Sequence, residues 1–281
     1  MDQHARPFRS VLYIPASKER ALEKARGLAV DAVIFDLEDA VAVEEKAAAR
    51  GMLAAALAQD YGARFRIVRI NGLETEWGLA DIAATKGADA VLLPKVNSAA
   101  DVEALAALVG DLPIWAMMET PLGIMNAGEI AAHPQLAGMV MGTNDLAKDL
   151  NCRFRADREP LLASLQMCLL AARSHGVVAI DGVYNAFKDE DGLRTECEQG
   201  RDMGFDGKTL IHPAQLAVAN AAFAPSAAEV DLARRQIAAL KVAEREGQGV
   251  AVVDGEIVEN LHIVTARQTL AKATMIAKLE G

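Results

Sequence analysis

The stretch Trp115-Ala-Met-Met-Glu119-Thr-Pro decides the fold of this 281-residue chain, and Met139-Val-Met-Gly142-Thr-Asn144-Asp145 repeats its pattern. Each is a short apolar run followed by a carboxylate, as is typical of a buried strand in a parallel sheet. Parallel barrels and open sheets place their functional residues at the carboxyl ends of such strands. Two carboxylates at the ends of successive strands therefore predict a pair of oxygen ligands for a hard cation.

Similar apolar runs recur along the chain, and together they predict eight strands, at residues 11–15, 32–35, 67–68, 90–93, 115–118, 139–141, 177–180 and 208–211. Between them lie Ala-rich, charged segments of helical character, including 19–28, 44–57, 99–108 and 161–174. Regular alternation of strands and helices indicates βα units joined by right-handed crossovers. We therefore expect an α/β fold, a (β/α)8 TIM barrel, for which about 250 residues are typical.

A doubly wound open sheet is the alternative. That fold needs a crevice where the strand order reverses, and it usually has a glycine-rich first turn. The first turn here, Ile14-Pro15-Ala16-Ser17, contains no glycine. The barrel is accordingly the better prediction.

The chain changes character after the eighth unit, and we expect a catalytic barrel over residues 1–224 and an appendage over 225–281. Ala224-Pro225-Ser226 is a break at which Ser226 can cap a helix. An amphipathic helix is predicted over 227–246, then a short hairpin around Asp254-Gly255, then a final helix from about Leu261. The appendage is either a cap on its own barrel or an arm onto a neighbouring subunit, and we favour the arm.

Composition excludes several classes of function. The chain is 52% hydrophobic and 24% charged, as expected for a soluble protein with a large core, and its net charge of -10 gives no electrostatic basis for binding nucleic acid. No apolar run reaches the roughly 18 residues of a membrane span, and the first residues lack the apolar segment of a signal peptide. The three cysteines are odd in number and lack metal-ligand spacing. These features predict a cytoplasmic protein with free thiols.

Six short motifs lie in order at predicted strand ends, and together they carry a resemblance to a known family: Arg9-Ser-Val-Leu-Tyr13-Ile-Pro15, Asp36-Leu-Glu38-Asp39-Ala-Val41, Val68-Arg69-Ile-Asn71, Met118-Glu119-Thr120, Gly142-Thr-Asn144-Asp145-Leu146 and Gly207-Lys-Thr-Leu-Ile211-His212-Pro213. The chain resembles the citrate lyase β-subunit-like branch of the HpcH/HpaI aldolase superfamily. Within that branch it is most similar to the bacterial enzymes that cleave malyl-CoA, in particular to the thioesterases among them.

The resemblance implies that Glu119 and Asp145 hold Mg²⁺, with Mn²⁺ as a substitute. Two protein carboxylates are enough for Mg²⁺, since it keeps several water or substrate oxygens. The alternative is that each carboxylate only caps the helix that follows, and Asn144-Asp145 before Leu-Ala-Lys suits a helix cap. For the two carboxylates as a pair, metal binding is the better interpretation.

The resemblance also assigns Arg69 to the thioester carbonyl or enolate of the substrate. An arginine at the rim of a barrel can clamp a carboxylate or stabilise an oxyanion, whereas an exposed arginine is usually only solvated. Glu38 and Asp39 follow the preceding strand. We expect them to orient Arg69 and the waters of the metal rather than to take part in the chemistry.

For coenzyme A, the resemblance implies contacts from Tyr13, Lys18 and Lys24. Lys18 and Lys24 lie six residues apart on the first predicted helix, although two such lysines are more often simply solvated. Asn144, Ile211 and His212 match positions that bind substrate. His212 precedes a proline and we do not assign it as a general base.

The tail departs from the family pattern. Lyases of the family end their hairpin with Asp-Gly-x-Met-Ile/Val-Asp-x-Pro, and the last aspartate serves a neighbouring active site as acid or base. Here the segment reads Asp254-Gly-Glu-Ile-Val-Glu259-Asn-Leu-His262, with a longer carboxylate and no proline. Carbon–carbon cleavage needs a base on the 3-hydroxyl and a route for protonating the enolate, whereas hydrolysis needs an activated water. The departure favours hydrolysis with Glu259 as the base.

The expected function is Mg²⁺-dependent hydrolysis of a short carboxylated 3-hydroxyacyl-CoA, best matched by (3S)-malyl-CoA, which gives malate and CoA. Retro-Claisen cleavage of malyl-CoA, citramalyl-CoA or citryl-CoA is the first alternative. A CoA-independent metal aldolase and a non-catalytic subunit are alternatives of other classes, and the full set of Glu119, Asp145 and Arg69 argues against the latter. The expected partners are the acyl-CoA substrate and further copies of the chain, as a trimer or hexamer.

Overall fold

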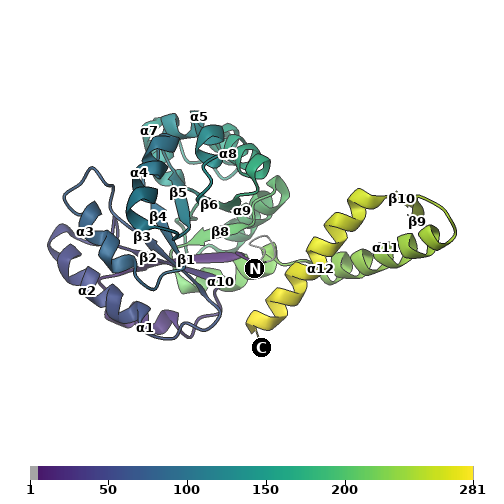
Figure 1. The fold of residues 1–281 in the computed structure, drawn as a ribbon, viewed down its shortest axis with the longest axis horizontal. Coiled ribbons are helices and arrows are strands. Elements are labelled where there is room, and N and C mark those ends of the chain that lie inside the picture. The colour runs from purple at the N-terminus through teal and green to yellow at the C-terminus, as the bar shows by residue number, and fades with distance from the viewer. Residues whose placement is uncertain (1–5, 281) are drawn as a thin grey trace. The chain divides into compact units, whose positions relative to one another are not determined.

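The structure, a computed structural model, describes residues 6–280 and contains a closed barrel of eight parallel strands in the order β1 to β8 (Figure 1). The strands are β1 Ser10–Pro15, β2 Ala32–Asp36, β3 Phe65–Arg69, β4 Ala90–Leu93, β5 Ile114–Met118, β6 Leu136–Met141, β7 Val178–Asp181 and β8 Gly207–Leu210. Pairing of β1 with β8 closes the barrel. The predicted (β/α)8 fold is confirmed.

Helices surround the barrel and alternate with its strands (Figure 1). The α-helices are α1 Glu19–Ala25, α2 Lys46–Leu57, α3 Gly78–Ile82, α4 Ala99–Val109, α5 Pro121–Met125, α6 Ala127–Ala131, α7 Thr143–Asp149, α8 Leu162–His175, α9 Glu190–Met203 and α10 Leu216–Phe223. Four of these helices continue directly into a short 3-10 helix at one end. These are η2 Val43–Glu45 before α2, η3 Ala83–Thr85 after α3, η4 Glu159–Leu161 before α8 and η5 Pro213–Gln215 before α10.

Two apolar layers hold the barrel together. Inside it, side chains from alternate strand positions form a closed core that includes Ile34, Ile67 and Leu92. Phe8 and Trp115 join this core in edge-to-face contact, with ring centroids 5.2 Å apart. The larger second layer lies between the strands and the helices. Burial on both faces explains why the strands read as continuous apolar runs.

The C-terminal residues form a separate compact unit, which begins at Ala224, while the barrel unit spans Phe8–Phe223. Its elements are α11 Ala227–Arg245, β9 Ala251–Val253, β10 Glu256–Val258 and α12 Asn260–Glu280. Ser226 caps α11 in a capping box with Glu229. The hairpin turns at Asp254 and Gly255, both with positive φ of 52° and 84°, as a tight hairpin turn requires.

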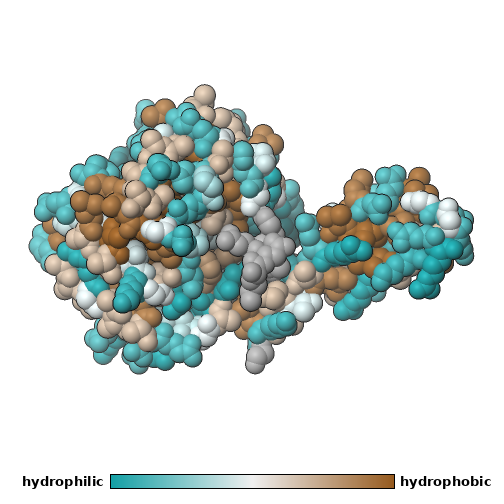
Figure 2. Space-filling model, in the orientation of Figure 1, coloured by the Kyte–Doolittle hydropathy of each residue, from teal (hydrophilic) through white to brown (hydrophobic). Residues whose placement is uncertain are grey.

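The C-terminal unit has a small core and a large exposed apolar surface. Leu240, Val258 and Ile263 are among its few buried side chains. Figure 2 shows brown, apolar side chains on this unit, and its exposed residues of that kind are Val242, Val250, Val252, Ile257, Leu261 and Val264. None of the helices within residues 6–280 has the length and apolar composition needed to cross a membrane.

Candidate active site at the carboxyl ends of the strands

A pocket of about 300 Å³ lies at the carboxyl ends of the barrel strands. It brings together seven of the predicted site residues, which come from six strand ends or the loops after them: Tyr13, Asp39, Arg69, Glu119, Asn144, Asp145 and Ile211. Asp36, Gly142 and Thr143 also line it. Parallel strands present their carboxyl ends on the same side of a barrel, and this explains why residues so far apart in sequence meet here.

Arg69 is buried and held in a fixed orientation by acidic neighbours. Its Nε and Nη2 donate to Oδ1 and Oδ2 of Asp36 at 2.8 Å and 2.6 Å, and its Nη1 lies 2.8 Å from Oε2 of Glu38. Asp39 is more distant, 3.8 Å from Nη1, and mostly exposed. Although burial opposes the charge, these carboxylates keep the pKa of Arg69 well above its usual range. The guanidinium is therefore a permanent, oriented cation.

Asp36 is the residue that the sequence analysis did not assign. It is fully buried, and it also accepts hydrogen bonds from the backbone N–H groups of Glu38 and Ala40. These bonds shape the turn that follows β2. The expectation that Glu38 and Asp39 orient Arg69 was incomplete, since the bidentate partner is Asp36, whose position at the strand end was visible in the sequence.

Lys95 is the second residue that was not assigned. Its Nζ donates to Oε1 of Glu38 at 2.5 Å, and its backbone N–H donates to Oε1 of Glu119 at 2.8 Å. It follows Pro94 directly after β4, so its location at a strand end was a signal that could have identified it. Lys95 thus connects the surroundings of Arg69 to a predicted metal ligand.

Glu119 is almost completely buried directly after β5, and only one of its carboxylate oxygens is satisfied. Within the described part of the chain, Oε2 accepts no hydrogen bond. Burial, and then the nearby Glu38, raise the pKa of Glu119 to about 7, with Lys95 and Arg69 acting in the opposite direction. A buried carboxylate with a free oxygen and insufficient positive charge around it is a suitable ligand for a cation.

Asp145 lies in the first turn of α7 and lines the same pocket as Glu119. The helix has no side-chain cap, and the residue before it is Gly142 rather than Asn144. The alternative interpretation of Asn144-Asp145 as a helix cap is therefore wrong. The Asp145 carboxylate is half-buried, and it makes no ion pair or hydrogen bond with residues 6–280. Its oxygens are available for a ligand.

Gly142 allows the two carboxylates to share this corner of the pocket. A Cβ built at residue 142 would overlap Cβ of Glu119 and would lie 2.5 Å from Oε2 of Glu119 and 3.0 Å from Cε of Met117. The N–H of Gly142 donates to the carbonyl of Met118, which continues the pairing of β5 with β6. The position therefore requires a residue without a side chain.

Tyr13 lines the pocket and lies against Arg69. Its ring centroid is 5.0 Å from the guanidinium carbon, and its hydroxyl lies 3.4 Å from the sulfur of Met117. Burial raises the pKa of Tyr13 far above its usual range, so the ring is neutral. This contact with an arginine is a role that the sequence analysis did not predict for Tyr13.

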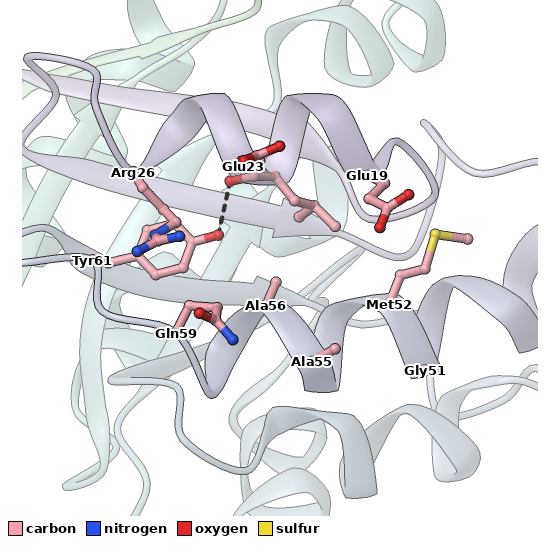
Figure 3. A pocket seen from close by; sticks show the side chains of 10 residues that line it. Glu19, Glu23, Arg26, Gly51, Met52, Ala55, Ala56, Gln59 and Tyr61 are labelled. Carbon is pink, nitrogen blue, oxygen red and sulfur yellow. Dashed lines mark hydrogen bonds between the residues drawn. The ribbon is translucent and has the colours of Figure 1, made fainter.

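The two lysines predicted to contact coenzyme A lie outside this pocket. Lys18 precedes α1 as its N-cap residue, and only Lys24 is within the helix. Lys18 forms an exposed ion pair with Glu45 at 3.4 Å. A groove of about 540 Å³ lies between α1 and α2, where Tyr61 donates to the carbonyl of Leu22 (Figure 3). Neither lysine lines that groove.

The remaining predicted residues have identifiable structural contacts. Asn144 exchanges hydrogen bonds with Asn185, of which the shorter is 2.8 Å. His212 caps η5 by accepting from the N–H of Ala214, and its ring lies 4.7 Å from that of Phe187. Glu259, on the C-terminal unit, directly precedes α12 and is exposed. Because one ring nitrogen of His212 accepts this hydrogen bond, the structure gives no reason to assign His212 as a general base.

A closed parallel barrel that carries carboxylates and an oriented arginine at its carboxyl rim has the arrangement of a barrel enzyme, whose functional residues lie at that end of the strands. The chain belongs to the HpcH/HpaI aldolase/citrate lyase family, whose sequence profile matches residues 9–213. The resemblance inferred from the six motifs is thereby confirmed.

Two groups of curated relatives match nearly the whole chain. It is 71% identical over 280 residues to the (3S)-malyl-CoA thioesterase of Cereibacter sphaeroides strain ATCC 17029, covering 99% of this chain and 98% of that protein. It is 37% identical over 285 residues to the citrate lyase subunit beta of Escherichia coli K12, covering 96% and 94%.

Solved structures of relatives contain the expected ligands. The protein CitE of Mycobacterium tuberculosis, in complex with magnesium, acetoacetate and coenzyme A, is 33% identical and superposes with a TM-score of 0.80 over 96% of this chain and 99% of that one. A citrate lyase beta subunit from the same organism, complexed with oxaloacetate and magnesium, is 36% identical, with a TM-score of 0.72 over 80% and 100%.

Proposed function

We propose that this protein hydrolyses (3S)-malyl-CoA to malate and CoA in a magnesium-dependent reaction. One observation supports this most directly: Glu119 and Asp145, with unsatisfied oxygens, line the same pocket as Arg69, which is held by Asp36. The 71% identity to a (3S)-malyl-CoA thioesterase over almost the full length of both chains specifies the substrate and the reaction.

The donor set of the pocket suits Mg²⁺. Its carboxylates supply oxygen ligands, and the rim carries more carboxylates than cations. The carboxylates are Asp36, Glu38, Asp39, Glu119 and Asp145, and the cations are Arg69, Lys95 and Lys46, whose Nζ donates to the backbone carbonyl of Glu38. Glu119 and Asp145 would hold the ion, which supplies Lewis-acid polarisation of a substrate oxygen and an acidified water when bound. Relatives solved with magnesium support the same choice of metal.

Arg69 stabilises the negative charge that develops on the thioester oxygen during hydrolysis. Asp36 holds two of its nitrogens, and the third, Nη1, lies against Glu38, while Arg69 as a whole lines the pocket. A donor already held in place does not need to reorganise as the charge forms. Tyr13 covers one face of the guanidinium and limits its contact with water.

Coenzyme A extends from the pocket toward α1, where Lys18 and Lys24 meet its phosphates. Both lysines are exposed, and Lys18 gives up only a weak surface pair with Glu45 when it does so. Asn144, Ile211 and His212 border the acyl end. A relative crystallised with coenzyme A supports binding of coenzyme A by the same fold.

Glu259 activates the water, and it is delivered by the C-terminal unit of a neighbouring subunit in a homo-oligomer, a trimer or hexamer. The exposed apolar side chains around it, including Ile257, Leu261 and Val264, suit a surface that is buried on assembly. Glu259 is one methylene longer than the aspartate of the family lyases. The proline that follows that aspartate in the lyases is absent after Glu259 in this chain.

Retro-Claisen cleavage of malyl-CoA to acetyl-CoA and glyoxylate is the second candidate. It is supported by the 37% identity to a citrate lyase subunit beta, since that likeness also extends over nearly the whole chain. The same metal ligands and the same arginine would serve either reaction. The two reactions differ in their products.

Product analysis tests the proposal. The purified protein is incubated with (3S)-malyl-CoA and Mg²⁺, and the products are separated while a hydrazine reagent traps any glyoxylate. Free CoA and malate in equal amounts, without trapped glyoxylate, are expected. Acetyl-CoA with trapped glyoxylate would establish the lyase instead. The Glu119→Ala variant is the control, and it should form neither set of products.

A further inference from the structure

Lys95 occupies an unusual position directly above the barrel rim. It follows Pro94 after β4, and its φ of 50° is in the left-handed region, which residues other than glycine rarely adopt. Non-glycine residues in such conformations are found mostly where the surrounding contacts hold them, often at functional sites. Lys95 has such contacts through both its backbone and its side chain.

The backbone N–H of Lys95 fixes one oxygen of Glu119. It donates to Oε1 at 2.8 Å, so the free oxygen is Oε2, which lies beside Gly142 at the end of the next strand. Asp145 follows three residues after Gly142. The contact therefore holds the free oxygen of Glu119 beside Gly142, in the pocket that Asp145 also lines.

The ammonium of Lys95 fixes one oxygen of Glu38 in the same manner. Nζ contacts Oε1 at 2.5 Å, and Oε2 is left for Nη1 of Arg69 at 2.8 Å. Oε2 is buried and accepts no hydrogen bond within the described chain, so Arg69 holds it by an ion pair alone. Glu38 thus stands between two cations, each of which holds one oxygen.

We propose that Lys95 is a positioning residue that couples the metal ligand Glu119 to the orientation of Arg69 through Glu38. The expected fall in kcat rests on the proposed function, because in that reaction Arg69 must be aligned with the thioester oxygen. Lys95 itself does not touch the reacting atoms. Its side chain is 46% exposed, so it is not part of the core and its loss should leave the fold intact.

Two substitutions test the ammonium. Lys95→Met keeps most of the stem, and Lys95→Gly accommodates the positive φ, while both retain the backbone N–H that contacts Glu119. We expect kcat for malyl-CoA hydrolysis to fall by about 10- to 100-fold in each, as is usual when partners around a metal site are removed. The affinity for Mg²⁺, measured calorimetrically without substrate, should be equal to or higher than that of the wild type, since a nearby positive charge has been removed.

Lys86→Met is the matched control, because Lys86 is an exposed lysine before the amino end of β4 and forms no ion pair with the residues described. It should match the wild type in kcat and in Mg²⁺ affinity. A wild-type kcat in Lys95→Met, or a loss of Mg²⁺ affinity as large as the loss of kcat, would overturn the proposal. A wild-type kcat would show that Lys95 does not couple Glu119 to Arg69. An equal loss of Mg²⁺ affinity would show that Lys95 affects metal binding alone.

A double-mutant cycle with Glu38→Gln tests the route of the coupling. If Lys95 acts through Glu38, the variant with both Lys95→Met and Glu38→Gln should be no slower than Glu38→Gln alone. Additive losses would overturn the route. A crystal structure of Lys95→Met is independent of the reaction, so it still decides the inference if malyl-CoA proves not to be the substrate. Loss of the contact between Arg69 Nη1 and Glu38 Oε2 is expected, and an unchanged contact contradicts the proposal.

Discussion

The guanidinium of Arg69 and the carboxylate of Asp36 form a buried bidentate pair, with N–O distances of 2.8 Å and 2.6 Å. The two residues are the last of β3 and β2, and they are direct partners in the register of that strand pair. Register therefore sets which carboxylate holds the arginine. Because a planar fork bound at two atoms cannot rotate, the third nitrogen keeps one direction.

Arg69→Lys should lose most of the activity, because an ammonium is a point charge that cannot reproduce the planar fork. Removal of one preorganised oxyanion donor typically lowers kcat by about 10²- to 10³-fold, and we expect a loss of that size for malyl-CoA hydrolysis. Affinity for Mg²⁺ should remain, since Glu119 and Asp145 are intact. Steady-state kinetics and calorimetry on the same preparation measure both. Near-normal turnover by the lysine variant would limit Arg69 to a bulk electrostatic effect.

Gly142→Ala should damage the metal site although it adds only a methyl group. The new Cβ would overlap the side chain of Glu119, whose Cβ is too close to the backbone to swing away. Overpacking of this kind costs about 1–3 kcal/mol of stability, and the displaced Oε2 should weaken Mg²⁺ binding as well. Denaturant unfolding and Mg²⁺ titration measure the two effects.

Gly128→Ala on α6 is the control for that substitution, since a Cβ there meets no atom within 4 Å. It should leave Mg²⁺ affinity unchanged and should not destabilise the fold. If Gly142→Ala bound Mg²⁺ as tightly as this control, the close packing of residue 142 against Glu119 would have no bearing on the metal.

The strand bounds could be predicted where an apolar run is uninterrupted and has a clear stop. β4 was predicted with its observed bounds, because Ala90–Leu93 is an unbroken apolar run that ends at a proline. β3 was predicted two residues too short at its start, since Arg66 interrupts the pattern. In the structure the charge of Arg66 is paired with Asp89 at 2.9 Å, which allows it to lie in a strand.

The site was predictable only in part, because its residues depend on different kinds of information. Glu119 and Arg69 could be found from strand ends alone. Asp36 was passed over because its role depends on the register between β2 and β3, which apolar patterning does not reveal. The position of Lys95 after β4 marks it as a rim residue, but its role depends on a positive φ and on a partner 57 residues away, Glu38, and neither of these leaves a local signal.

Binding of Mg²⁺ should depend on pH through Glu119. In the metal-free protein, burial and Glu38 raise the pKa of this carboxyl to about 7, so the proton and the cation compete below that pH. The apparent affinity should be constant well above pH 7 and should weaken by up to about tenfold for each pH unit below it. Calorimetry in buffers of different ionisation enthalpy should detect one proton released per ion near pH 6.

Glu38→Gln is the informative companion, because it removes the negative charge that contributes to the raised pKa of Glu119. The pH at which Mg²⁺ affinity begins to weaken should move to lower values in this variant. An affinity that does not change between pH 5.5 and pH 8 in the wild type would mean that Glu119 is not a ligand, or that it does not carry a proton in the metal-free state.

Glu259 is the site residue whose role separates hydrolysis from carbon–carbon cleavage. If it is the base that activates water, Glu259→Gln should keep the KM for malyl-CoA but lower kcat sharply, since glutamine preserves the shape and removes proton transfer. Glu259→Asp shortens the side chain toward the family's lyase arrangement and should raise glyoxylate formation relative to hydrolysis. Full activity of Glu259→Gln would exclude Glu259 from the mechanism, and with it the argument for hydrolysis drawn from the tail.

Subunit mixing tests whether Glu259 acts on a neighbouring barrel. Glu119→Ala and Glu259→Gln subunits are each expected to be inactive, but a mixed oligomer would contain some sites that pair an intact barrel with an intact tail. Because Glu259 belongs to a compact unit separate from the barrel, the two substitutions should not affect the folding of one another. Partial recovery of malyl-CoA hydrolysis is expected after the two variants are unfolded and refolded together, with mixed oligomers verified by differently tagged subunits. No recovery in verified mixtures would show that each tail serves its own barrel, since in that arrangement every subunit keeps its own defect.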